Sequence, residues 1–331
     1  MGIGVIGLGV GAQHALAYAG LDSCKLLYVY DLDTPKMQRM LGQLRQGTAA
    51  DSVETLLQDE SVDVVSIASY DDMHGPQVVA ALRAGKHVFV EKPLCRSVEE
   101  LRAIKHAWLM SGHRHLASNL VLRAAPLYRW LRDAVTGGEL GDIYGFDGDY
   151  LYGRLSKITD GWRKNVLNYS VMQGGGVHLV DLMLWLTGQR PRSVTAVGNR
   201  ICTEGTAFHY HDYMSATFTF ASGLVGRITA NFGCVHRHQH VLRVFGTKGT
   251  FIYDDMGPRL HTSRDPAVPA TKLGLAAAPA SKGDLIPGFI DAILKGTDIR
   301  DQTQHEFDVI SACLGADRAL AAAKCVEIEY V

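Results

Sequence analysis

A glycine-rich turn near the N-terminus limits what this chain can fold into more than any other feature. The apolar residues 3–6 predict a short strand, and Gly7-Leu-Gly-Val-Gly-Ala12 follows it directly and leads into a helical pattern. Gly7 permits a tight turn, Gly9 lets the backbone approach a pyrophosphate, and Ala12 is small enough for close packing of helix on strand. The helix N-terminus adds N–H groups and a positive dipole. This pattern predicts a βαβ unit that binds a dinucleotide.

A carboxylate at the end of the second predicted strand supports this interpretation. Residues 26–30 predict a strand that leads into Asp31, roughly 20 residues after the glycine-rich turn. An acid at this spacing binds the ribose hydroxyls of the adenosine half of the cofactor. Its charge repels the 2′-phosphate of NADP, so the sequence predicts NAD in preference to NADP. A plain turn between strand and helix, without a nucleotide, is the alternative.

Strand and helix patterns alternate as far as residue 119. Proline is favoured at the first helical position, so Thr34-Pro35 predicts a helix start, and Ser97 with Glu100 forms a capping box that starts another. Short connections between alternating elements favour a parallel sheet with helices on both faces. Further strands are predicted at residues 62–68, 87–90 and 115–119, and further helices after Ser52 and before Gly85. The predicted class is α/β, with a doubly wound Rossmann domain at residues 1–122.

The remaining residues, 123–331, predict a second domain of α+β type. The glycine turn at 246–249 joins two strand patterns as a hairpin, and most of the other patterns here are strands as well. Strands are predicted at 142–152, 193–201, 213–220, 224–232, 240–245, 250–253 and 326–331, and helices before Gly137, over 284–295 and over 303–324. We expect a large open, mostly antiparallel sheet with helices on one face. Its uncovered face would expose apolar area, which favours a homodimer or homotetramer.

Two stretches carry residues suited to acid–base chemistry. Glu91, Lys92 and Pro93 follow the strand at 87–90, and ligands of open α/β sheets bind just beyond the carboxyl ends of strands. His178 and Asp181 lie three residues apart on a helix that is apolar almost all round and follows three glycines. Burial of two ionisable groups is costly unless they are paired or used. The alternatives are a surface lysine and a core histidine with satisfied hydrogen bonds.

A polar and aromatic loop at residues 161–169 precedes this helix. Arg163 offers a planar guanidinium for hydroxyls or a phosphate, and the Tyr169 hydroxyl can donate to a sugar oxygen. With Asn165 and Asp181, they are our candidate substrate-binding residues, and an ordinary surface loop is the alternative. The histidines at 236, 238 and 240 alternate, with two more at 209 and 211, but a metal site needs converging imidazoles and usually a further ligand. We predict no metal site and favour substrate-facing or interface histidines.

The composition argues against several classes of protein. A net charge of −1 leaves no basic surplus for nucleic acid or for an anionic membrane surface. The six cysteines are widely spaced without a C-x-x-C pair, which is typical of free thiols in a reducing compartment. No uncharged run approaches the roughly 20 residues of a membrane helix, and the N-terminus lacks the charged segment of a signal peptide. We expect a cytoplasmic protein.

Three segments resemble the Gfo/Idh/MocA family of NAD(P)-dependent oxidoreductases, which act mostly on sugars, inositols and related compounds. They are residues 7–14, 65–74 and 84–94, and the last, Ala-Gly-Lys-His-Val-Phe-Val-Glu-Lys-Pro-Leu, is the most specific. The resemblance spans nearly the whole chain. It implies a catalytic-site role for Lys92, a cis bond between Lys92 and Pro93, and assembly into a homo-oligomer through the second-domain sheet.

The resemblance also assigns further residues. A histidine in a glycine-rich helix start is catalytic in the family, which implies this role for His178, and an arginine at the place of Arg123 lies near the nicotinamide. Many relatives have an aspartate four residues before that histidine, where this chain has Gly174, and members without it include some that act on nucleotide-linked sugars. Whether Asp181 replaces this aspartate stays open. The expected cofactor-binding residues are Gly7, Gly9, Val10, Gly11, His14, Asp31, Ser69, Asp72, His74, Glu91, Lys92, Asn119 and Arg123.

These residues predict an NAD-dependent oxidoreductase that acts on CH–OH groups. Oxidation of a secondary alcohol removes a hydride from carbon and a proton from oxygen, and the protein must take the proton. Histidine, with an ordinary pKa near 6.5, suits this task. We expect His178 to be the general acid/base and Lys92 to orient the hydroxyl, or these roles to be exchanged. The alternatives are NADH-dependent reduction of a keto-sugar on a nucleotide carrier and a dinucleotide-responsive binding protein without turnover, which needs neither residue.

Overall fold

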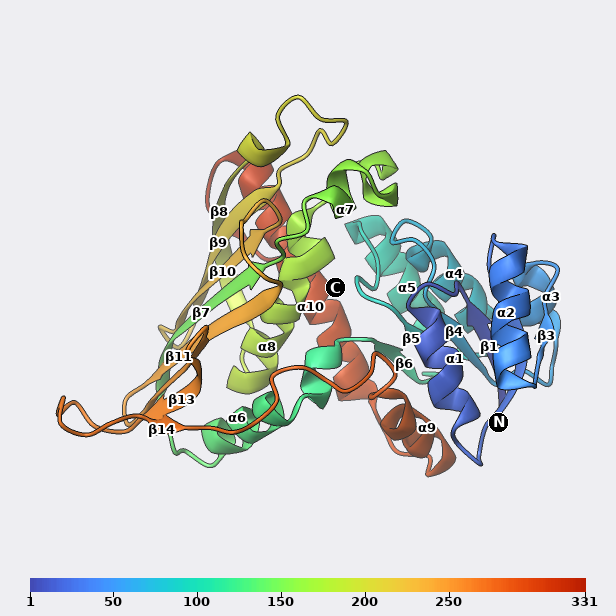
Figure 1. Ribbon diagram of the computed structural model, residues 1–331, viewed down its shortest axis with the longest axis horizontal. Coiled ribbons are helices and arrows are strands. Elements are labelled where there is room, and N and C mark those ends of the chain that lie inside the picture. The colour runs from blue at the N-terminus through green and yellow to red at the C-terminus, as the bar shows by residue number, and fades with distance from the viewer. The chain divides into compact units, whose positions relative to one another are not determined.

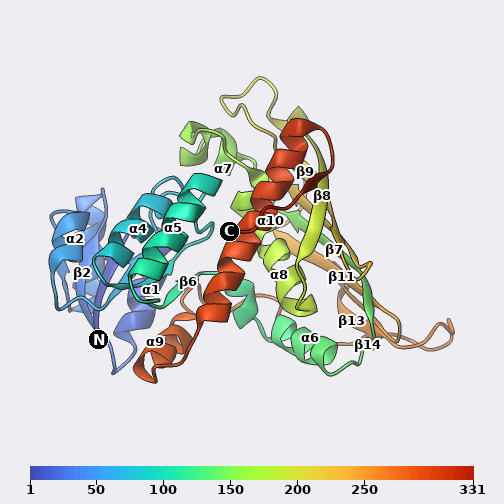
Figure 2. The same ribbon diagram turned by 180° about the vertical axis from the view of Figure 1, so that it is seen from behind.

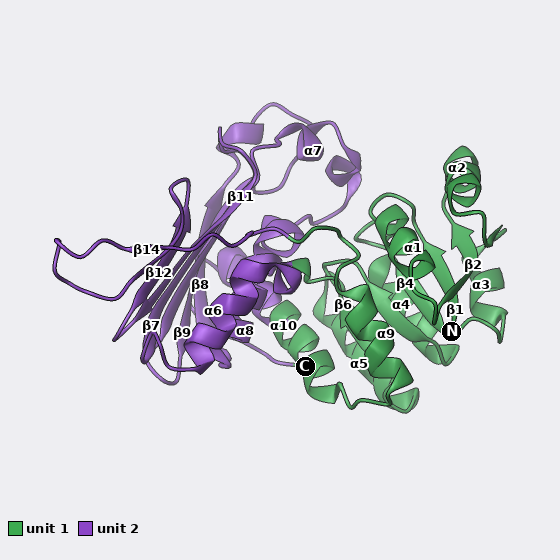
Figure 3. Cartoon of the chain, turned by 60° about the horizontal axis from the view of Figure 1, so that its bottom comes forward, with its two compact units in different colours: residues 1–121, 279–310, 331 green, residues 122–278, 311–330 purple.

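The computed structural model describes residues 1–331, which form two compact units (Figure 3). The first contains residues 1–121, 279–310 and 331, and the second contains residues 122–278 and 311–330. The sequence predicts a boundary after residue 122 and places everything beyond it in the second domain. The structure instead returns residues 279–310 to the first unit, so that helix α10 (Arg300–Ala322) is divided between the two.

The first unit is built on a parallel sheet of six strands, in the order β3-β2-β1-β4-β5-β6 (Figure 1). Every neighbouring pair is parallel, so the predicted doubly wound Rossmann sheet is confirmed. The strands are β1 (Gly2–Ile6), β2 (Lys25–Tyr30), β3 (Thr48–Ala49), β4 (Val64–Ile67), β5 (His87–Val90) and β6 (Leu116–Ser118). The sequence does not predict β3, which is too short to show a periodic pattern.

The helices of the first unit begin where side-chain caps are available. Ser52 Oγ accepts the Thr55 N–H at 3.1 Å, and Ser97 Oγ accepts the Glu100 N–H at 3.1 Å, which satisfies donors that a helix start leaves unpaired. The helices are α1 (Gly11–Ala19), α2 (Thr34–Leu44), α3 (Val53–Gln58), α4 (His74–Arg83), α5 (Val98–Met110) and α9 (Ile286–Leu294). Helices α4 and α5 pack side by side (Figure 2). The predicted helix starts at 34, 52 and 97 are therefore confirmed within one residue.

Helix α9 belongs to the first unit because its apolar residues complete that unit's core. Ile286, Phe289 and Ile290 are buried in one cluster with Ile3 of β1 and Phe89 of β5. The rings of Phe89 and Phe289 lie 5.4 Å apart. Each such side chain contributes about 1.5–3 kcal/mol when it leaves water. This burial explains why the chain returns to a domain that it left more than 150 residues earlier.

The second unit is built on a nine-stranded sheet in the order β14-β13-β12-β11-β7-β10-β9-β8-β15. Only β7 and β10 pair in parallel, so the predicted mostly antiparallel sheet is confirmed, as is the hairpin of β11 and β12. The strands are β7 (Ile143–Leu151), β8 (Pro191–Asn199), β9 (Tyr213–Phe220), β10 (Val225–Asn231), β11 (Gln239–Gly246), β12 (Thr250–Asp254), β13 (Gly257–His261), β14 (Thr271–Lys272) and β15 (Val326–Glu327). The sequence does not predict β13 and β14.

Helices lie on one face of this sheet, and the other face carries none (Figures 1 and 3). The sequence predicts an apolar uncovered face, but its central strands carry an ion-pair network in which Asp149 bonds Arg227 at 2.9 Å and Arg243 at 3.3 Å. The unit's helical segments are η1 (Val121–Ala124), α6 (Pro126–Thr136), α7 (Ser156–Thr159), η2 (Trp162–Asn165), the π-helix η3 (Met172–Gly176), α8 (Val177–Thr187) and η4 (Ile201–Thr203). None of the chain's helices has the length and hydropathy of a membrane span.

Candidate functional site

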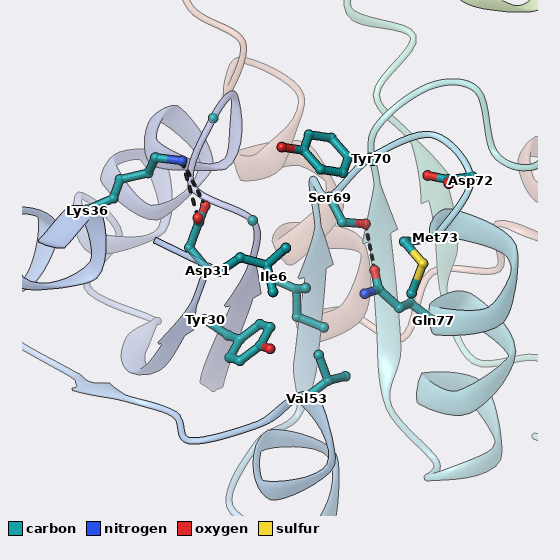
Figure 4. Close-up of a pocket in the computed structure, with 13 residues that line it drawn as sticks. Ile6, Tyr30, Asp31, Lys36, Val53, Ser69, Tyr70, Asp72, Met73 and Gln77 are labelled. Atoms are coloured by element: carbon teal, nitrogen blue, oxygen red, sulfur yellow. Dashed lines mark hydrogen bonds and ion pairs between the residues drawn. The ribbon is translucent and has the colours of Figure 1, made fainter. Parts of the chain in front are cut away.

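A cavity of about 380 Å³ lies at the carboxyl ends of β1, β2 and β4 in the first unit (Figure 4). This is the edge at which ligands of doubly wound sheets bind. The residues that line it are Ile6, Gly7, Gly9, Tyr30, Asp31, Leu32, Lys36, Val53, Ser69, Tyr70, Asp72, Met73 and Gln77. Five of them, Gly7, Gly9, Asp31, Ser69 and Asp72, are among the predicted cofactor-binding residues, and the volume is in the range of small-molecule pockets.

The glycine-rich turn leaves room for a ligand at one position and is closed at two others. Gly7 has a φ of +82°, and a Cβ atom there would lie 2.4 Å from the Ala68 carbonyl oxygen, so no other residue fits. A Cβ atom on Gly9 would meet nothing within 4 Å, which leaves its backbone open to approach. At Gly11 it would lie 3.0 Å from the Ala68 Cβ, so Gly11 provides the close helix–strand packing that the sequence assigns to Ala12.

Asp31 is held in place and kept ionised by several donors. Its carboxylate accepts the Leu8 N–H at 2.6 Å and the Asp33 N–H at 2.9 Å, and the Lys36 ammonium lies 3.2 Å away (Figure 4). Burial would raise the pKa of Asp31, but these hydrogen bonds and the Lys36 charge outweigh it and lower the pKa below its ordinary value. The bond to Leu8 also fixes the glycine-rich turn against the acid that is predicted to bind ribose.

The loop after β4 supplies the opposite wall of the cavity. Ser69 Oγ donates to Gln77 Oε1 at 2.6 Å, which ties the loop to α4. Tyr70 and Met73 stand beside it in the cavity wall and are 47% and 44% exposed (Figure 4). The sequence does not single out these two, although they flank the predicted residues Ser69 and Asp72, because exposed apolar side chains give no signal without a fold.

His74 joins the two loops that follow β4 and β5. It is fully buried, and its Nδ1 lies 2.7 Å from the Pro93 carbonyl oxygen while Nε2 lies 3.3 Å from the Ser69 carbonyl oxygen. The Lys92–Pro93 bond is cis, as the resemblance implies. Lys92 is half-buried directly after β5. His74 does not line the cavity, and its contacts position the segment that carries Lys92.

Three of the predicted cofactor-binding residues form a buried polar network. His14 Nδ1 lies 3.0 Å from Ser66 Oγ, and its Nε2 lies 3.2 Å from Glu91 Oε1, which also accepts a hydrogen bond from Asn119 Nδ2 at 2.6 Å. Burial alone would raise the pKa of Glu91, but His14, Lys92 and Asn119 hold it well below its ordinary value. The network fixes Glu91, the residue before Lys92, as a buried carboxylate.

The cavity and the turn therefore fit NAD. Gly9 leaves space for a diphosphate, α1 presents its N-terminus there with Val10 as N-cap, and Asp31 offers an ionised carboxylate for ribose hydroxyls.

In the second unit, two glycines, Gly174 and Gly175, allow aromatic side chains to press against the backbone before His178. A Cβ atom on Gly175 would lie 2.3 Å from the Tyr150 ring, and one on Gly174 would lie 2.1 Å from Tyr169 Oη. Both glycines belong to the π-helix η3, which continues directly into α8. His178 lies in the first turn of α8 and is 6% exposed. The tight packing fixes the direction in which α8 begins.

Aromatic rings surround His178. Its ring centre lies 6.5 Å from that of Tyr150 and 5.6 Å from that of His240. His238 is 5.0 Å from His240, whereas His236 pairs with Asp255 at 3.1 Å. Two of the alternating histidines therefore belong to the His178 cluster. No group of three His, Cys, Asp or Glu side chains in the chain is arranged to hold a metal ion.

Asp181 and Arg123 bind each other. Arg123 Nε donates to both carboxylate oxygens of Asp181, at 3.0 and 3.1 Å, and Nη2 donates to one of them. Asp181 is 1% exposed, so its side of this ion pair is buried. Loss of either partner would therefore leave an unpaired charge in the interior. The sequence assigns Asp181 to the substrate and Arg123 to the cofactor. Their contact indicates that Asp181 orients Arg123.

Asp317 of α10 holds the segment that precedes α8, and no sequence pattern predicts this role. Its carboxylate accepts hydrogen bonds from Ser170 Oγ at 2.6 Å and Gln173 Nε2 at 2.7 Å. Burial raises the pKa of Asp317 to about 6, although these two donors act in the opposite direction. The bonds span 147 and 144 residues, so only the folded chain reveals the site.

This raised pKa predicts a pH-dependent stability. Between the ordinary value of 3.8 and about 6 the folded protein binds more protons at Asp317 than the unfolded chain, so its contribution to the free energy of unfolding falls as pH rises through this window. Asp317→Asn removes the titration and retains a hydrogen-bonding side chain. The difference in thermal unfolding midpoint between wild type and this variant should therefore fall across the window. A difference that is constant with pH would contradict the assignment.

In the loop before η3, Arg163 Nε donates to Tyr169 Oη at 3.1 Å. Tyr169 is buried, whereas Asn165 is exposed at the end of η2. The structure thus brings two of the three predicted substrate-binding residues of this loop together.

Comparison with known proteins agrees with this description. The family described as "Oxidoreductase family, NAD-binding Rossmann fold" matches residues 1–116, and the GFO/IDH/MocA C-terminal domain matches residues 128–252. The UDP-N-acetylglucosamine 3-dehydrogenase of Acidithiobacillus ferrooxidans is 31% identical over 234 residues, which cover 70% of this chain and 67% of that protein. The myo-inositol 2-dehydrogenase of Thermotoga maritima is 27% identical over 272 residues, 77% of this chain and 76% of that protein.

Solved structures share the fold along the whole chain. Levoglucosan dehydrogenase in complex with NADH superposes with a TM-score of 0.86 at 20% identity, and covers 100% of both chains. GenD2 from gentamicin A biosynthesis, in complex with NAD, gives a TM-score of 0.83 at 23% identity over 99% of this chain and 96% of that one. The two domain matches and the relative that is 31% identical establish that the chain belongs to the Gfo/Idh/MocA family of NAD-binding oxidoreductases.

Proposed function

We propose that this protein transfers a hydride between NAD and a secondary alcohol or ketone of a sugar, an inositol or a nucleotide-linked sugar. The observation that carries the proposal is the cavity at the glycine-rich turn, with an ionised Asp31, in a chain that also carries Lys92 and His178. Relatives named as dehydrogenases of myo-inositol, levoglucosan and UDP-N-acetylglucosamine support this substrate class.

The chain's own residues handle the proton. Bound NAD accepts or supplies the hydride. We propose that His178 takes the hydroxyl proton during oxidation and returns it during reduction, as a general acid/base. Lys92 hydrogen-bonds the same oxygen and stabilises its alkoxide character. The buried network at Glu91 and the His74 contact with Pro93 hold the Lys92 segment, and the packing of η3 holds His178.

The proposal is tested with the compounds named for the relatives. The panel is myo-inositol, levoglucosan and UDP-N-acetylglucosamine with NAD⁺, and 1,5-anhydro-D-fructose with NADH. We expect a substrate-dependent change in NADH absorbance with at least one of them. Tight NADH binding without turnover of any panel member would instead favour a dinucleotide-responsive binding protein.

Asp31 should determine the choice between NAD and NADP. Asp31→Ser removes the carboxylate but leaves Lys36 at the same wall, where its ammonium can bind a 2′-phosphate. We expect kcat/KM for NAD to fall at least about 10-fold, because a charged hydrogen bond is lost, while kcat/KM for NADP rises. In Asp31→Ser/Lys36→Met the gain with NADP should disappear. Unchanged cofactor preference in both variants would contradict the role of Asp31.

We also propose a homodimer or homotetramer that is formed through the uncovered face of the second-unit sheet. The network of Asp149, Arg227 and Arg243 offers a self-complementary charged surface there. Light scattering on the purified protein distinguishes the two states, and a monomer at micromolar concentration would contradict the proposal.

A further inference from the structure

The Tyr169 hydroxyl fills the space of a missing side chain next to His178. A Cβ atom on Gly174 would lie 2.1 Å from Tyr169 Oη and 2.8 Å from Cζ, much closer than unbonded atoms approach. Position 174 is four residues before His178, and residues at this spacing in a helical run are neighbours on one face. The hydroxyl therefore occupies the place from which a residue-174 side chain would flank His178.

Packing holds Tyr169 in this place. The side chain is 5% exposed, and its ring meets those of Phe208 at 5.8 Å and Phe232 at 6.4 Å, both nearly edge-on. The Gly174 N–H donates to the Ser170 carbonyl at 2.9 Å, which keeps the backbone turn against the tyrosine. A buried, tightly packed aromatic ring moves little, so its hydroxyl is a fixed polar group.

Arg163 sets the direction of the Tyr169 hydrogen bond. Arg163 Nε donates to Tyr169 Oη at 3.1 Å, and the guanidinium lies over the Trp162 ring, 4.4 Å from its centre. Because Arg163 donates to a lone pair of Oη, the hydrogen of the Tyr169 hydroxyl points away from the guanidinium. The cationic donor also polarises the O–H group and makes it a stronger donor.

We propose that Tyr169, oriented by Arg163, is a specificity-determining residue that donates a hydrogen bond to a substrate oxygen adjacent to the one on which His178 acts. This inference rests on the proposed function and deepens it. A carboxylate at position 174 would be an anionic acceptor, whereas Tyr169 is a neutral donor with the Arg163 guanidinium next to it. Tyr169 and Arg163 therefore favour substrates whose oxygen at this point can accept a hydrogen bond. Such an oxygen belongs to a hydroxyl, a carbonyl or an anionic group.

The first test removes the hydroxyl and keeps the ring. Tyr169→Phe preserves the packing against Phe208 and Phe232, so the protein should fold normally. We expect kcat/KM for the best panel substrate to fall about 10-fold or more, with NAD affinity unchanged. Tyr169→Phe/Arg163→Leu should be little worse than Tyr169→Phe alone, because the two residues act as a unit.

The second test transfers the polar group to position 174. Tyr169→Ala vacates the space, so Tyr169→Ala/Gly174→Asp can place a carboxylate there. A neutral substrate hydroxyl can turn its own hydrogen toward this carboxylate, so we expect the variant to recover about 10-fold or more of the activity that Tyr169→Ala loses on such a substrate. Tyr169→Ala/Gly174→Ala is the matched control and should recover none. Gly174→Asp in the wild-type background should lower the thermal unfolding midpoint, because Tyr169 blocks the side chain.

The outcomes separate this inference from the proposed function. If the unaltered protein turns over no panel member, the proposed function fails, and this inference fails with it. If the unaltered protein is active, the inference alone is overturned by wild-type kcat/KM in Tyr169→Phe. It is overturned equally if the variant with Asp at 174 recovers no more activity than the matched variant with Ala.

Discussion

Lys92→Met should lower turnover by about 10² or more while the affinity for NAD stays nearly unchanged. Methionine keeps much of the length and apolar character of the lysine stem but cannot donate a hydrogen bond or carry the charge that stabilises an alkoxide. The cavity at the glycine-rich turn is not lined by Lys92, so the adenosine half of the cofactor should bind as before. Steady-state kinetics with the best panel substrate and NADH titration by fluorescence measure the two quantities.

Lys86 offers a matched control at the other end of the same strand. It precedes β5 as Lys92 follows it, and its ammonium donates to the Asp59 carbonyl at 2.7 Å. Lys86→Met should cost some stability because it removes this hydrogen bond, although the Asp59 carbonyl still accepts the Val62 N–H at 3.1 Å, but turnover per folded protein should stay at the wild-type level. Wild-type turnover in Lys92→Met, or an equal loss in Lys86→Met, would refute the role assigned to Lys92.

His178→Asn should reduce turnover by about 10² or more and should also change the pH dependence of the reaction. A histidine acts as a base only when neutral, so oxidation by the wild type should slow as pH falls and the imidazole gains a proton. The variant lacks this group, and its residual rate should lose that decline. Profiles of kcat/KM against pH for both proteins measure the difference, because they report the ionisations of the free enzyme.

His236→Asn is the corresponding control, because His236 pairs with Asp255 outside the cluster around His178. It should retain both the wild-type rate and the wild-type pH profile. If His178→Asn kept the acidic decline, the titrating base would be another group, and the proposed role of His178 would be wrong.

The sequence predicts most of the fold because the responsible signals are local. The glycine-rich turn, the buried strands and the caps at Ser52 and Ser97 each act over a few residues, and the structure confirms them. The return of α9 to the first unit was not predictable in this way. It depends on the contact of Phe289 with Phe89, 200 residues earlier in the chain, and an apolar helix pattern does not say which core it joins.

The candidate site could likewise be predicted only where the signal is local. Motifs locate Asp31, because the acid and the glycine-rich turn keep a characteristic spacing. They do not reveal Lys36 beside Asp31 or the support that Asp317 gives to η3, because an ordinary lysine or aspartate has no distinctive pattern. The pairing of Asp181 with Arg123 likewise joins residues 58 positions apart. Such contacts follow from packing, which a single sequence does not encode in its local periodicity.

The central claim is that Lys92, in the first unit, and His178, in the second, act on the same hydroxyl group. The most direct measurement is a crystal structure of the protein with NAD⁺ and the panel substrate that it turns over. The account predicts Lys92 Nζ and a ring nitrogen of His178 both within hydrogen-bonding distance, about 2.6–3.2 Å, of the oxygen on the reacting carbon. A complex in which either group points away from that oxygen would contradict it.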